Sequence, residues 1–147
     1  LIAGALLRFG DRTADGDGRA EIVAVLDELD GLDVAPRPIA LAAAPIAAWF
    51  VADAPRAERL FAQARSSDDP WVRATVPLAL AHWAENQGDL DVARRHLQEA
   101  LVAFRAIGER WGLATTLGSL SSLRLLDEDL DGAEAALEAQ RLGLFRR

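Results

Sequence analysis

The chain has 147 residues, which suits one domain with a substantial hydrophobic core, and it lacks cysteine, which excludes disulfides, thiolate metal sites and a cysteine nucleophile. The formal net charge is −7, and all 16 basic residues are arginines, most of them interspersed with acids. This pattern excludes the clustered positive surface that nucleic-acid binding requires. No apolar run reaches the ~18 residues of a membrane span, and no secretory signal pattern is present, so we expect a cytoplasmic protein.

The composition favours helices over sheet. Alanine is the commonest residue, and it loses no side-chain entropy in a helix. Apolar residues recur at helical spacing, and no segment alternates with the period of a strand. In chain order we expect helices at residues 1–9, 19–29, 39–51, 55–65, 71–87, 89–107, 111–126 and 129–144, joined by a glycine-rich connection at 11–18 and a proline-containing loop at 31–38.

Several residues suit the ends of these helices. Asp89 has a charge that favours a helix N-terminus, and Gly88 and Gly108 suit helix ends. The segment 66–70 predicts a turn whose serines and aspartates cap the next helix. Pro77 removes a backbone donor, so an irregularity is expected near it.

The segments 71–105 and 111–145 match each other at an offset of 40 residues. Nine positions are identical: Trp71/Trp111, Ala74/Ala114, Thr75/Thr115, Leu80/Leu120, Asp89/Asp129, Leu90/Leu130, Asp91/Asp131, Ala93/Ala133 and Leu97/Leu137. A more divergent unit precedes them at an offset of 36, where Asp53, Ala57, Phe61 and Ala64 correspond to Asp89, Ala93, Leu97 and Ala100. Such periods are typical of architectures in which each unit buries its apolar face on its neighbours.

We therefore predict an all-α solenoid of antiparallel helix hairpins. It forms a single domain over residues 1–147, with divergent N-terminal helices at 1–30, a degenerate repeat at 38–66, and clear repeats at 71–107 and 111–146. Because the chain contains no methionine and ends within a helical pattern, we interpret it as a fragment of a longer chain.

The turn Gly88-Asp89-Leu90 and the residues after it resemble the tetratricopeptide repeat (TPR). The resemblance implies a right-handed superhelix in which large residues fill gaps between helices and small ones lie where helices cross. The large positions are Leu80 and Leu97, and the small ones are Ala81, Ala93 and Ala100; the last repeat offers Leu120, Ser121, Ala133 and Leu137. Arg124, Glu128 and Gln140 depart from the family pattern.

The long second helix, with its segment AFRAIGER at 103–110, is similar to repeats in large bacterial regulators. These are the actinobacterial antibiotic-regulatory proteins and the maltose-regulator-like ATPases. In those families the ATPase and DNA-binding modules lie elsewhere in the chain, and the repeats sense or dock a partner. The resemblance implies that the repeats of this chain also sense or dock a partner, and that the ATPase and DNA-binding modules lie elsewhere.

In this repeat class the first helix of each unit lines a concave groove. The resemblance places a partner-binding surface on Thr75, Leu78, His82, Glu85 and Asn86 of one unit and on Thr115, Gly118, Ser122 and Leu125 of the next. Small, hydroxyl and apolar groups suit a peptide segment or a partner helix. The alternative is a solvated groove that binds nothing.

The aromatic residues are interpreted as packing residues. We expect Trp71 and Trp111 to pack on the preceding unit, Trp49, Phe50 and Phe61 to lie in the core, and Trp83 to be packed as well.

No catalytic or metal constellation exceeds chance. His82 and His96 have no acid or thiol at ligand spacing, and a trio of Ser121, His82 and Asp127 lacks a nucleophile-elbow signature. The acidic stretch 11–18 imitates part of an EF-hand loop, but Ala24 occupies the position of the required glutamate. We expect neither a metal nor a cofactor.

The sequence thus predicts a non-catalytic interaction and signal-sensing domain of a bacterial transcriptional regulator. Its partner is a protein or peptide, with a small-molecule signal as the other option, and it contacts neither nucleic acid nor membrane. The alternative is a free-standing helical scaffold that dimerises through end faces carrying Leu142 and Phe145.

Overall fold

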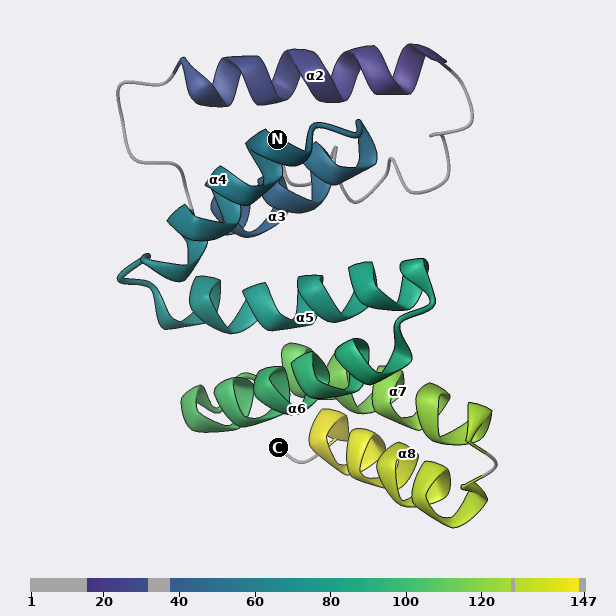
Figure 1. Ribbon diagram of the computed structural model, residues 1–147. Coiled ribbons are helices and arrows are strands. Elements are labelled where there is room, and N and C mark those ends of the chain that lie inside the picture. The colour runs from purple at the N-terminus through teal and green to yellow at the C-terminus, as the bar shows by residue number, and fades with distance from the viewer. Residues whose placement is uncertain (1–15, 32–37, 128, 146–147) are drawn as a thin grey trace. The chain divides into compact units, whose positions relative to one another are not determined.

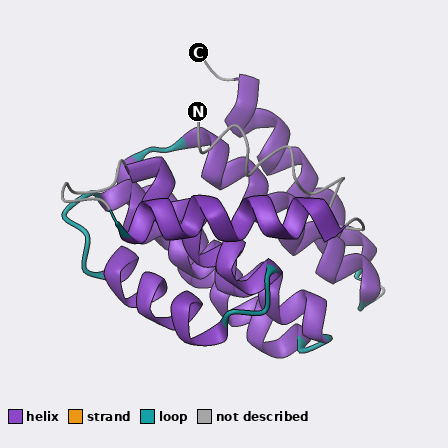
Figure 2. Cartoon of the chain, turned by 90° about the horizontal axis from the view of Figure 1, so that it is seen from above, coloured by secondary structure: helices purple, strands orange, loops and turns teal. Residues whose placement is uncertain are grey.

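The alanine-rich segments with helical periodicity fold as helices. The computed structural model describes residues 16–31, 38–127 and 129–145, and in these ranges it contains seven α-helices and no strand (Figures 1 and 2). The expected all-α class is confirmed. The helices are α2 (Gly16–Asp30), α3 (Pro38–Phe50), α4 (Ala54–Arg65), α5 (Pro70–Gln87), α6 (Leu90–Ile107), α7 (Arg110–Leu126) and α8 (Leu130–Phe145).

Each of these helices begins and ends within three residues of its predicted bounds. The largest difference is at α2, which begins at Gly16 and so includes three residues expected in a loop. Pro77 does not interrupt α5, and Pro45 lies fully buried inside α3. The expected helix at 1–9 lies outside the described residues. None of the described helices is long and apolar enough to cross a membrane.

The chain divides into two compact units, residues 1–72 and 73–147. The expectation of one domain over the whole chain stays a prediction, and the two units are described separately below.

The described part of the first unit is α2, α3 and α4. Its core combines one apolar face of α2 with the alanines of α3. Ile22, Leu26 and Leu29 occur at helical spacing, and all three are buried. The ring of Trp49 lies 4.4 Å from that of Phe61, centroid to centroid, and is tilted by 46°.

Ion pairs join α2 to α4 on the surface of this unit. The guanidinium of Arg56 lies 2.7 Å from Asp27, 3.3 Å from Asp30 and 3.4 Å from Asp53. Arg59 lies 2.9 Å from Asp30 as well. The hydrogen bond to Asp27 is the main reason why the pKa of Arg56 is raised. Sequence periodicity did not predict this cluster, because its members come from different helices.

Capping residues fix the helix ends in both units. Asp69 Oδ1 accepts a 2.8 Å hydrogen bond from Trp71 N at the start of α5. Asp89 Oδ1 accepts one of 3.2 Å from Val92 N at the start of α6. Gly108 ends α6 with a φ of 67°, a conformation that favours glycine. These predicted caps are confirmed, as is Gly88, which ends α5 with a φ of 78°.

In the second unit a two-residue turn joins α5 to α6, α6 packs on α7, and α7 packs on α8. Glu109 caps α7 by accepting hydrogen bonds from Trp111 N at 3.0 Å and Gly112 N at 2.6 Å. Gly112 lies directly against the buried Phe104 of α6. A Cβ atom at this position would be only 2.3 Å from the ring, so a larger residue would not fit without a shift. Contact with a glycine thus brings the first turn of α7 close to α6.

Two polar contacts join α7 to α8. The buried Ser121 hydroxyl donates a 3.1 Å hydrogen bond to Ala133 O, and the Arg124 guanidinium donates one of 2.7 Å to Gly132 O. Arg124, one of the departures from the family pattern, therefore bonds to the first turn of α8. Gln140, another departure, lies beside Gly118, which leaves space for its amide.

Some expected packing residues are exposed. Trp111 is 56% exposed, because Gly112 is the residue of this turn that faces Phe104. Phe50 is exposed because its neighbour Trp49 points towards Phe61, and adjacent helical residues point in different directions. Trp83 is also partly exposed, whereas Phe61 is buried as expected. These expectations for Trp111, Phe50 and Trp83 were wrong.

Alanine dominates the interior. Half of the buried hydrophobic residues in the described ranges are alanines, and several of them, such as Ala48, Ala57, Ala93 and Ala100, are completely inaccessible. Small side chains let helix axes approach closely. The composition therefore accounts for the close packing of short helices.

Candidate partner-binding groove

A hydrogen bond joins the first helices of the two clear repeats. His82 Nε2 of α5 lies 3.2 Å from Ser119 Oγ of α7, and both residues are half-buried. Either group donates, according to the tautomer of the imidazole. The contact places the predicted groove residues of α5 near those of α7, across 37 residues of sequence.

Most predicted groove residues remain accessible. Thr75, His82 and Glu85 are half-buried and Asn86 is exposed on α5, whereas Leu78 is buried and presents no surface to a partner. On α7, Thr115 is half-buried and Ser122 and Leu125 are exposed. The Ser122 hydroxyl also donates to Gly118 O at 3.2 Å.

Ser119 was missed by sequence reasoning. Strict 40-residue equivalence relates His82 to Ser122, but the bond forms to the serine one turn earlier. The available signal was the run Gly-Ser-Leu-Ser-Ser at 118–122, which places three hydroxyls within two helical turns. Repeat numbering alone does not select among them.

The surface of α5 and α7 carries few charges. Arg73 and Glu85 are the charged residues of α5, and Arg110 and Arg124 are those of α7. In contrast, α6 carries five charged residues at Asp91, Arg94, Arg95, Glu99 and Arg105. A surface with hydroxyls, an imidazole and amides can form hydrogen bonds with a peptide backbone or polar side chains without requiring an opposite charge.

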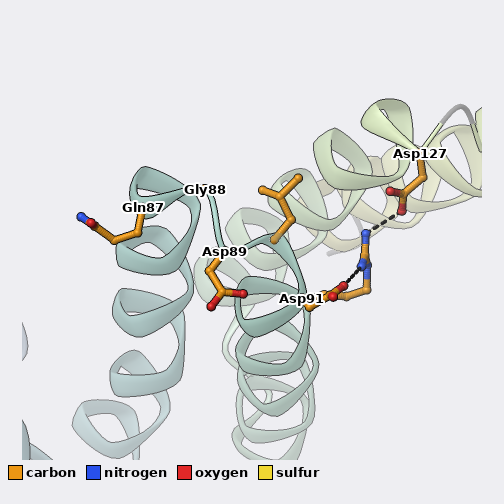
Figure 3. Close-up of a pocket in the computed structure, with 7 residues that line it drawn as sticks. Gln87, Gly88, Asp89, Asp91 and Asp127 are labelled. Carbon is orange, nitrogen blue, oxygen red and sulfur yellow. Dashed lines mark hydrogen bonds and ion pairs between the residues drawn. The ribbon is translucent and has the colours of Figure 1, made fainter.

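An open depression lies at the turn end of this unit (Figure 3). Its four charged side chains, Asp89, Asp91, Arg94 and Asp127, already have structural partners. Arg94 is 3.1 Å from Asp91 and 2.6 Å from Asp127, pairs that the dashed lines in Figure 3 mark, and Asp89 caps α6. The ion pair between Arg94 and Asp127 therefore joins α6 to the end of α7 at this depression. It is lined by Gln87, Gly88, Asp89, Leu90, Asp91, Arg94 and Asp127.

The residues of the Ser-His-Asp trio have separate partners. Ser121 bonds to Ala133 O, His82 bonds to Ser119, and Asp127 pairs with Arg94. The other histidine, His96, lies 3.1 Å from Glu99 on the surface of α6. Within the described ranges, no three His, Cys, Asp or Glu side chains are grouped so that they could hold a metal ion.

Comparison with known proteins gives no relative. No protein-family model matches the chain, and no curated protein and no solved structure matches it either.

Proposed function

We propose that this chain is a TPR-like interaction module whose groove, on α5 and α7, binds a segment of a partner protein. The module is a right-handed superhelix in which α5–α6 and α7–α8 are consecutive repeats. The close turn between α5 and α6, the packing of α6 on α7 and of α7 on α8, and the 40-residue repeat support this arrangement.

The hydrogen bond between His82 and Ser119 is the observation that carries the proposal. It joins the two helices that line the groove in this class of repeat, and accessible polar residues flank it. A peptide segment suits such a surface because its backbone offers donors and acceptors along its length.

In the wider proposal, this module is the sensing part of a bacterial transcriptional regulator. Support comes from the length of α6 (Leu90–Ile107) and from the similarity of its sequence to repeats of actinobacterial regulators. A bound partner, protein or small-molecule signal, shifts the equilibrium of attached modules by its different affinity for their two states.

A random peptide library displayed on phage serves as the probe of the groove. Peptides selected on the 147-residue protein are measured against His82→Ala/Glu85→Ala and against Arg95→Ala/Glu99→Ala, a control pair on α6. We expect the groove variant to weaken binding about tenfold or more, equivalent to about 1.4 kcal/mol, and the control to bind like the wild type. Peptides that bind all three proteins equally contradict the proposal, provided that circular dichroism shows all three folded.

The second candidate function is a dimerisation scaffold. The observation that favours it is the exposure of Leu137 and Leu142 on α8. Leu142 belongs to the predicted end face; the side chain of Phe145 lies outside the described residues.

A further inference from the structure

Glu85 is the one formally charged residue among the predicted groove positions. It is half-buried on α5, about one helical turn beyond His82. Within the described ranges its carboxylate forms no ion pair and no hydrogen bond. The 40-residue repeat places Leu125 at the equivalent position of α7, so the repeat pattern itself does not require a charge here.

The arginines of this unit do not neutralise Glu85. Arg94 is paired with two aspartates, and Arg124 donates a hydrogen bond to Gly132 O on α8. Arg73, the other charged residue of α5, precedes Glu85 by twelve residues, which is about 18 Å along the helix axis. The described part of the chain therefore leaves this carboxylate without a cation.

The groove presents hydrogen-bond acceptors at the level of Glu85. Helices α5 and α7 run in the same direction (Figure 1). Because His82 is bonded to Ser119, one further turn along each helix brings Glu85 level with Ser122. The Ser122 hydroxyl donates its hydrogen to Gly118 O at 3.2 Å, so its oxygen offers a ligand only lone pairs. A ligand that fits this level of the groove carries donors.

The same end of the groove favours positive charge. Helices α5 and α7 end here, at Gln87 and Leu126, and the C-terminus of a helix is the negative end of its dipole. The adjoining depression is lined by three aspartates and a single arginine (Figure 3). A surface of this sign attracts cationic groups of a ligand.

We propose that the groove recognises a basic side chain, arginine or lysine, in the bound segment of the partner protein, and that Glu85 binds it. The inference rests on the proposed function, since it requires a peptide in the groove. A cationic donor can bond to the Glu85 carboxylate and to the Ser122 oxygen together. Leu125, which is 50% exposed one turn beyond Ser122, offers an apolar surface to the methylene groups of either side chain.

Peptides selected from the displayed random library test the charge requirement. We expect those that bind the wild-type protein to share an arginine or lysine at one position. Glu85→Gln keeps the size of the side chain and removes its charge, so it should weaken binding about tenfold in isothermal titration calorimetry. Glu134→Gln removes an exposed carboxylate of α8 and is the matched control, which should bind like the wild type.

Exchange of the charges tests the contact itself. A peptide whose shared basic residue is replaced by glutamate should bind the wild type weakly and regain affinity for Glu85→Arg. Added salt should weaken binding of the original peptide to the wild type more than to Glu85→Gln. A residue that only supports the fold gives neither result. Circular dichroism shows whether each variant is folded.

The outcomes for this inference and for the groove are distinguishable. Loss of affinity in both Glu85→Gln and His82→Ala, with recovery on charge exchange, supports both. Peptides that depend on His82 but bind Glu85→Gln like the wild type, or that share no basic residue, overturn the basic partner and leave the groove in place. Peptides that ignore every groove variant, or a library that yields no binder, overturn the groove and this inference with it.

Discussion

At the scale of single residues, Gly112 of α7 lies directly against the ring of Phe104 of α6. A Cβ atom at Gly112 would lie 2.3–2.5 Å from three carbons of a ring that is itself fully buried. The ring has no space to move away, because interiors are closely packed. The first turn of α7 therefore depends on the absence of a side chain at this position.

The substitution Gly112→Ala should lower the free energy of unfolding by about 1–3 kcal/mol, the usual cost of overpacking. Gly118→Ala is the matched control. Its Cβ would lie 3.1 Å from the amide of Gln140, a side chain that can rotate away, and alanine gains up to about 1 kcal/mol in a helix. Urea denaturation compares the two, and equal stability would refute the packing argument.

The roles of residues that cap helices were predictable from the sequence. The burial of residues that pack between helices was less predictable. Asp89 and Gly108 act where they were expected, because capping depends on a few neighbouring backbone groups. Trp111 was expected to pack because Trp71 is its equivalent, yet Trp71 is half-buried and Trp111 exposed. Burial depends on the neighbouring helix, which a local pattern does not describe.

At the scale of helices, the same residue has a different environment in successive repeats. Leu97 and Leu137 share a position in the 40-residue pattern, and both were expected to fill gaps between helices. Leu97 does so, and Leu137 does not, because α7 packs on α6 and the described part of this unit adds no helix to that face of α8.

We therefore expect Leu97→Ala to cost about 2–5 kcal/mol and Leu137→Ala less than about 0.5 kcal/mol. Thermal or urea unfolding at low micromolar concentration checks this, where self-association makes little contribution. Similar losses in both variants would mean that the face of α8 is covered within one chain.

Contacts between helices also explain which parts of the candidate groove were predictable. The positions on α5 and α7 followed from repeat numbering, but the pairing of His82 with Ser119, and not with Ser122, depends on how one helix is rotated against the other. The same applies to the ion pairs of Arg56 and Arg94, whose partners lie 29 and 33 residues away in sequence. The groove itself stays a prediction.

At the scale of the whole molecule, the division into two units has an energetic consequence. Each unit has buried residues of its own, Leu26 in the first and Leu97 in the second. In the repeat architecture that we propose, stability is close to a sum of local terms, so damage in one part spreads little.

Amide hydrogen exchange tests this in a pair of variants. Leu26→Ala should speed exchange in α2, α3 and α4 and leave the amides of α7 and α8 as protected as in the wild type. Leu97→Ala should produce the reverse pattern. Faster exchange throughout the chain in both variants would show that the units unfold as one.

In the alanine-rich interior, substitutions can cause steric crowding much more often than they can leave cavities. At Ala48, Ala57, Ala93 or Ala100 almost every replacement adds atoms to a position with no accessible surface, and glycine is the one natural residue that removes any. Random substitutions at such sites therefore lower stability mainly by overpacking and seldom by creating cavities. A lineage carrying this protein should tolerate exchange among its larger core residues and conserve its buried alanines.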